Sequence, residues 1–160
     1  MDWLREEARD IYLLRLIALF LILDFLWCIA IGSIIKNKLH PILPSRFLQF
    51  PMPLIILSIS IDAFIEEVLF RLIPLYTAVK IFSKKSYLIL GVAIISSVIF
   101  GVLHGSPWNI LIQGEGGLLY SLLYLKSGGL QGNHNKAISA STFLHASFNI
   151  IAIMGIKIFS

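Results

Sequence analysis

Long apolar stretches separated by short polar segments dominate the pattern along this chain. A membrane-spanning helix needs roughly 20 mostly apolar residues, so five of these stretches predict spans. Their ranges are Ile11–Ile35, Pro53–Val79, Tyr87–His104, Ile110–Leu125 and Ala137–Phe159. The third and fourth are short, which suits helices that line a polar cavity. The pattern therefore predicts an all-α, multi-pass membrane helix bundle of about five transmembrane helices around a polar catalytic cavity.

Composition supports a membrane location. Of the 160 residues, 58% are hydrophobic and only 14% are charged. A soluble protein of this length could not bury so much apolar side-chain surface away from water. The net charge of +4 lies mostly between apolar stretches, which indicates membrane topology and no nucleic-acid partner. Positive residues such as Arg5, Arg9 and Lys80 favour a cytoplasmic N terminus and an external C terminus, in the cell membrane with lipid as surroundings.

Polar segments divide the chain into two predicted parts. Residues 1–52 contain the first span and the proline-bearing loop Lys36–Phe50, and the only charges in that span are Arg15 and Asp24. Residues 53–160 form a predicted four-helix catalytic core. Within it, Pro74 is expected to kink the second span. The segment Lys126–Lys136 is expected to be a glycine-rich loop that contains a solvated His134.

Three charged residues interrupt the second apolar stretch in the pattern E-E-x-x-x-R: Glu66, Glu67 and Arg71. A central charge costs roughly 2.5–3.5 kcal/mol on insertion scales, so these groups must be paired or face a polar interior. Glu67 and Arg71 are four residues apart and are predicted to pair. Glu66 points about 100° away, which leaves it available for chemistry, and Asp62 lies one turn before it. A purely structural ion-pair network is the alternative interpretation.

Two more motifs, each with a histidine, lie in later apolar stretches. Phe100 and His104 form F-x-x-x-H, and one-turn spacing predicts that the phenyl ring contacts the imidazole. His145 and Asn149 form H-x-x-x-N in the last stretch and are predicted to share an inward face. The alternatives are a polar helix end for His104 and an interhelical hydrogen bond for the second pair.

The chain has no G-x-S-x-G or H-E-x-x-H pattern, so neither a serine-hydrolase nor a zinc-protease motif is present. The three motifs above therefore supply the candidate groups for hydrolysis. Glu66 with His104 could hold and deprotonate a water, while His145 and Asn149 could donate hydrogen bonds to a tetrahedral intermediate. Alternatively, Glu66, His104 and His145 could bind a zinc ion that keeps an open position for water.

The order of the three motifs on successive apolar segments resembles the CPBP family of CAAX prenyl proteases, bacteriocin-processing enzymes and Abi proteins. The resemblance covers roughly Ile59 to Met154 and includes the glycine-rich stretch Gln113–Tyr120. It implies an all-helical intramembrane endopeptidase. By this resemblance the catalytic group comprises Glu66, His104, His145 and Asn149. The structural motif residues are Glu67, Arg71 and Phe100.

The resemblance does not decide whether catalysis uses a metal ion or which substrate is cleaved. The family is described both as metalloproteases and as metal-free glutamate proteases. Asparagine is a poor zinc ligand and a good oxyanion donor, so Asn149 favours the glutamate type with no required cofactor. The expected substrate is a membrane-associated peptide or protein. So short a chain favours a leader, a bacteriocin-like peptide or a membrane-anchored sorting tail over CAAX proteolysis.

Two non-proteolytic functions are alternatives. A non-catalytic family member would be a membrane immunity factor or assembly chaperone, against which the complete motifs argue. A small transporter or proton-relay subunit would also place Glu and His in spans. The sequence lacks the internal repeat that is common in transporters.

Overall fold

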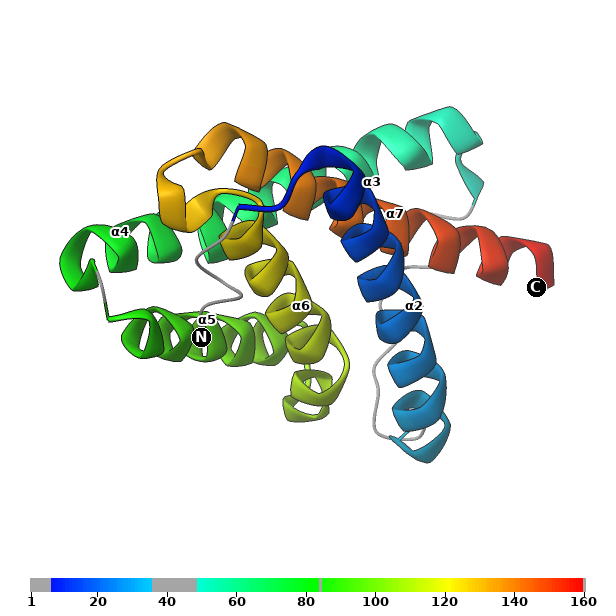
Figure 1. Cartoon of the computed structure of the whole chain (residues 1–160). Helices are drawn as coiled ribbons and strands as arrows, with labels where there is room; N and C mark the ends of the chain where they lie inside the picture. Colours follow the sequence, from blue (N-terminus) through cyan, green and yellow to red (C-terminus); the bar gives the residue numbers. More distant parts are fainter. Residues whose placement is uncertain (1–6, 36–48, 84, 160) are drawn as a thin grey trace.

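The protein is a bundle of helices in the computed structural model, which describes residues 7–35, 49–83 and 85–159. Every regular element in these ranges is helical, so the predicted all-α class is confirmed. Most of the predicted loop Lys36–Phe50 and the charged residue Arg5 lie outside the described residues. Figure 1 shows the arrangement of the α-helices. They are α2 (Asp10–Ile35), α3 (Met52–Glu67), α4 (Ile73–Phe82), α5 (Ser86–Leu103), α6 (Gln113–Lys126) and α7 (His134–Phe159).

Three of these helices are long and apolar enough to cross a membrane by length and composition: α2, α5 and the segment His134–Lys157 of α7. In α2 only 11% of the most apolar window is buried, so most of its side chains face outward, as suits contact with lipid. The other two predicted spans are also helical. However, α6 has 14 residues, and a π-helical turn divides the helix that contains Pro53–Val79.

That π-helical turn, η3 (Val68–Leu72), ends two residues before Pro74. Proline has no backbone N–H, so Pro74 leaves the carbonyl of Phe70 without its usual helical donor. The hydroxyl of Ser96, on α5, donates a hydrogen bond to this carbonyl instead. The irregularity predicted at Pro74 is thus a change of helical winding, with the Ile73 N–H bonded to the Val68 carbonyl, five residues earlier.

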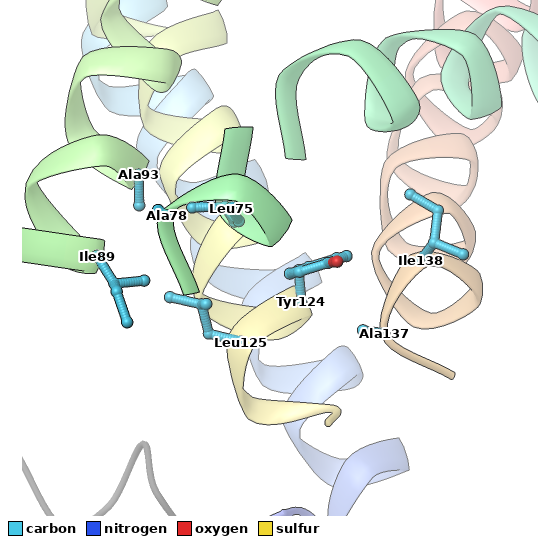
Figure 2. Close-up of a cluster of buried hydrophobic side chains, with 8 residues drawn as sticks. All are labelled: Leu75, Ala78, Ile89, Ala93, Tyr124, Leu125, Ala137 and Ile138. Carbon is cyan, nitrogen blue, oxygen red and sulfur yellow. The ribbon is translucent and has the colours of Figure 1, made fainter. Parts of the chain in front are cut away.

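Helix α6 lies at the centre of the bundle and packs against α5, α7 and α2 (Figure 1). Figure 2 shows one buried cluster in which α4, α5 and α7 meet α6. Its members are Leu75, Ala78, Ile89, Ala93, Tyr124, Leu125, Ala137 and Ile138. A second cluster joins α2 to α6 and α7 through Leu16, Ile17, Phe20, Tyr120, Leu123, Ala140 and Leu144. Burial of both clusters fixes α6 and α7, the helices that carry much of the polar chemistry.

The connection between α6 and α7 is shorter than the predicted loop Lys126–Lys136. Lys126 still belongs to α6, and α7 begins at His134. Gly128 and Gly132 have φ values of 116° and 88°, which lets the chain reverse within a few residues. The solvated-loop prediction for His134 was therefore wrong: its Nδ1 lies 2.9 Å from the Tyr124 hydroxyl oxygen.

Candidate active site

A buried ion pair forms the base of the site. Glu67 ends α3 and Arg71 lies in the π-helical turn, and both side chains are fully buried. Arg71 Nη1 lies 3.2 Å from Glu67 Oε1, the contact predicted from their spacing. The guanidinium group also lies over the ring of Phe100, with its carbon 4.3 Å from the ring centre. Two buried charges thus compensate each other inside the bundle.

The buried His145 of α7 joins this ion pair to the neighbouring carboxylate. Its Nδ1 donates a hydrogen bond to Glu67 Oε1 at 3.0 Å. Its Nε2 lies 3.5 Å from Glu66 Oε2. The ring of Tyr120 is stacked on the imidazole, with centroids 4.6 Å apart and planes at 22°. The imidazole is therefore fixed at one nitrogen and over one face, and its other nitrogen points toward Glu66.

His104 approaches Glu66 from the other side, where α5 ends. Its Nδ1 donates a hydrogen bond of 2.7 Å to the Phe100 carbonyl, and its Nε2 lies 3.7 Å from Glu66 Oε1. The predicted contact with the Phe100 ring is present, edge-on at 4.4 Å between centroids. The side-chain amide of Asn109 donates to the His104 carbonyl and holds the helix end. Two imidazole Nε2 atoms thus face one carboxylate, at distances longer than direct hydrogen bonds.

Glu66 and His104 open onto a cavity of about 340 Å³ between α3 and α7. Asn149 also lines it, so the structure brings together Glu66, His104 and Asn149 on one surface, with His145 buried directly behind Glu66. Asp62 and Gln113 add polar groups to the wall, and apolar side chains of α3 and α7 form the rest. The full lining is Ile59, Asp62, Glu66, His104, Gln113, Phe148, Asn149, Ala152, Ile153 and Ile156.

Glycine in α6 permits the close helix approach around the ion pair. A Cβ atom on Gly117 would lie 2.7 Å from Arg71 Nη2 and 3.1 Å from the Phe100 ring. Real Cβ atoms do not approach other atoms so closely, so a larger residue at this position would displace the guanidinium. Part of the glycine-rich stretch Gln113–Tyr120 thus allows close helix packing.

The donor set can be tested against zinc. No group of three or more His, Cys, Asp and Glu side chains suited to hold a metal ion occurs in the part of the chain that the structure describes. Glu66, His104 and His145, as arranged, are thus not such a group.

Comparison with protein-family models adds an independent observation. A model described as type II CAAX prenyl endopeptidase Rce1-like matches residues 48–151, more than half of the chain. The protein belongs to this Rce1-like family. No curated protein and no solved structure matched the chain.

Rce1-like proteins are CAAX-type proteases, so the chain is an intramembrane protease that acts on membrane-associated peptides or proteins. With its three apolar helices it is an integral membrane protein. The family predicted from the motifs is confirmed. The expectation that so short a chain acts on substrates other than CAAX peptides stays a prediction.

Sequence reasoning missed two residues next to the Rce1-like motifs. Tyr120 covers His145, and the carboxylate of Asp24 accepts a hydrogen bond from the Tyr120 hydroxyl. Asp24 lies in α2, outside residues 48–151. One signal could have found it: an aspartate in the middle of a 26-residue apolar helix is costly enough to demand a partner.

Proposed function

We propose that the protein hydrolyses a peptide bond of its membrane-associated substrate with a water activated by Glu66. One observation carries this proposal: the Glu66 carboxylate lies between the Nε2 atoms of His104 and His145 at the wall of a cavity. Each imidazole uses its Nδ1 hydrogen elsewhere, on the Phe100 carbonyl or on Glu67. The Glu66 carboxylate and Nε2 of His104 are then both acceptors of hydrogen bonds, and a water molecule supplies the donor that they need.

In the proposed reaction, the water donates its hydrogens to Glu66 and to Nε2 of His104. Its oxygen attacks the scissile carbonyl carbon, and its proton passes to the Glu66 carboxylate. The C–N bond then breaks as Glu66 returns that proton to the leaving amine. The distances of 3.5 and 3.7 Å suit a free enzyme, in which catalytic contacts are often loose.

The negative oxygen of the tetrahedral intermediate is stabilised by His145 and Asn149. The Asn149 amide lines the cavity and has N–H groups to donate. His145 already shares its Nδ1 proton with Glu67, so in this mechanism it carries a second proton on Nε2. Such donors act strongly in a site that excludes water. No metal is required, because Asn149 suits an oxyanion better than it suits zinc.

The cavity supports a substrate that is largely apolar. Ile59, Phe148 and Ile153 line it beside the polar groups, so a hydrophobic segment can lie along α7 while its peptide bond meets Glu66. We propose four candidates in order: a prenylated C-terminal peptide, a leader, a bacteriocin-like peptide and a sorting tail. We also propose a cell-membrane location with a cytoplasmic N terminus, which tag accessibility in sealed vesicles would check.

The test compares purified variants in detergent on peptides of these four kinds. Glu66→Gln removes the base and keeps the shape, and it is expected to reduce kcat by about 10²–10⁴-fold. Asn149→Ala is expected to reduce kcat by about 10²-fold through loss of an oxyanion donor. The control is His134→Gln. His134 lies in α7, as Asn149 does, but outside the cavity lining, so this variant should keep its activity.

Two results would change the proposal. Cleavage retained by Glu66→Gln would remove Glu66 from the chemistry and would require another group to activate the water. Activity lost in a strong chelator and restored by zinc would replace the metal-free mechanism with a zinc mechanism. Unchanged activity in the chelator is the expected result.

A further inference from the structure

A carboxylate that the motifs do not contain is buried beside the site. Asp24 lies in α2 and is 1% exposed, in a helix that is otherwise mostly exposed and apolar. Burying such a group inside a membrane helix is costly, so its position calls for a function. Its Oδ2 accepts a hydrogen bond of 2.8 Å from the hydroxyl of Tyr120 on α6. The thiol of Cys28 lies near the other oxygen, with Sγ 3.6 Å from Oδ1.

Tyr120 connects this carboxylate to the proposed oxyanion donor. Its side chain is buried, and its ring is stacked on His145. The hydrogen bond from Nδ1 to Glu67 holds one atom of the imidazole, and the ring of Phe100 meets the imidazole edge-on, with centroids 5.8 Å apart. The tyrosine ring packs flat against one face of the imidazole, and the hydroxyl held by Asp24 keeps the tyrosine in place.

The packing around this pair is built to accommodate it. A Cβ atom on Gly116 would lie 3.1 Å from the Tyr120 hydroxyl oxygen and 3.2 Å from Asp24 Oδ2. Glycine therefore leaves room for the hydrogen bond where α2 crosses α6. The hydroxyl, the carboxylate and the imidazole lie on three helices, so a shift of any one helix would be transmitted to the other two.

We infer that Asp24 is a positioning residue, which holds Tyr120 against His145 and so aims Nε2 at the reacting carbonyl. The inference rests on the proposed role of His145. It assigns a catalytic task to α2, which the matched family region does not include. Asp24 does not touch the substrate; it acts through Tyr120.

The test compares Tyr120→Phe, Asp24→Ala and the double variant on a cleaved peptide. Each single variant removes the same hydrogen bond, and a small misplacement of a catalytic group reduces kcat by about tenfold. KM should change less than about twofold, because binding is unaffected. The double variant should be no slower than either single one, since one interaction has been removed. Asp24→Asn keeps an acceptor oxygen and should restore kcat.

The matched control is Tyr124→Phe. Tyr124 lies one turn further along α6, is equally buried and loses a hydroxyl contact to His134, away from the cavity. It should lower stability and leave kcat unchanged. The inference is overturned if Tyr124→Phe slows catalysis as much as Tyr120→Phe, or if the effects of Asp24→Ala and Tyr120→Phe multiply in the double variant.

An NMR measurement separates this inference from the proposed function. In protein with isotope-labelled histidine, the ring signal of His145 reports its stacking on Tyr120. The signal should move in Tyr120→Phe and Asp24→Ala and should keep its wild-type position in Asp24→Asn and Tyr124→Phe. An unmoved signal overturns the inference whether or not any peptide is cleaved. A moved signal in protein that cleaves no peptide would uphold the positioning and contradict only the protease mechanism.

Discussion

Two fully buried carboxylates, Glu67 and Asp24, flank the site, and they are stabilised in different ways. Glu67 has a cationic partner one turn away, Arg71, and a second contact in His145. The described partners of Asp24 are a hydroxyl, a thiol and the carboxyl group of Glu115, with His145 as an electrostatic neighbour. The first carboxylate belongs to a charge network, and the second is held by hydrogen bonds to polar groups. Loss of charge should therefore be severe at Glu67 and mild at Asp24.

The largest effect is expected from Glu67→Gln. It leaves the Arg71 guanidinium buried without its counter-charge, and breaking such a pair costs about 3–5 kcal/mol. The free energy of unfolding in mixed micelles should fall by that amount. The double variant Glu67→Gln with Arg71→Met should recover part of the loss, since no unpaired charge remains. No recovery in the double variant would contradict the charge-network interpretation.

The next effect is expected from Gly117→Ala, which crowds the charged cluster. The added methyl group would meet Arg71 Nη2 and the Phe100 ring, and overpacking typically costs about 1–3 kcal/mol. The thermal unfolding midpoint should fall and cleavage with it, because Arg71 is displaced from Glu67. Gly91→Ala is the control, since nothing lies within 4 Å of its added Cβ. It should be neutral or slightly stabilising.

A smaller effect is expected from Gly116→Ala, the corresponding change beside Asp24. Its added Cβ would meet the ends of two side chains at 3.1 and 3.2 Å, which can move by a few tenths of an ångström. The cost should be about 1 kcal/mol, at the lower end for overpacking. Thermal unfolding of both alanine variants in one detergent gives the comparison. A larger fall in the unfolding midpoint for Gly116→Ala than for Gly117→Ala would contradict the expectation that the packing beside Asp24 is the more tolerant of the two.

The smallest effect is expected from Asp24→Asn. The amide oxygen still accepts from Tyr120, and within the described residues Asp24 forms no ion pair whose cation would lose its partner. The free energy of unfolding should change by less than about 1 kcal/mol, far below the loss in Glu67→Gln. Denaturant titrations of the two variants, run side by side, would measure this difference. Equal losses would show that Asp24 has a charged partner after all.

Local spacing explains which of these contacts could be predicted from sequence. Glu67 and Arg71 are four residues apart on one helix, so their pairing follows from helical geometry. The contact between Phe100 and His104 follows in the same way. Hydropathy likewise predicted the helical class and approximate helix bounds, because apolar stretches of this length form helices in a membrane.

The missed contacts depend on tertiary packing. Asp24 and Tyr120 are 96 residues apart, and no local pattern relates them. The predicted loop Lys126–Lys136 was too long because polarity alone does not end a helix. The left-handed conformations of Gly128 and Gly132 set the length of that connection. The convergence of Glu66 with both histidines was inferred from shared polarity, and only packing supplies the distances.

The π-helical turn at Val68–Leu72 has an evolutionary consequence. Such a turn is equivalent to one residue inserted into an α-helix, and each residue of an α-helix accounts for about 100° of rotation. Deleting one of the three residues between Glu67 and Arg71 would restore regular winding and move Arg71 about the helix axis relative to Glu67, which would disturb the buried ion pair. Homologous sequences should therefore align without gaps between Glu67 and Arg71, even where the surrounding loops vary in length.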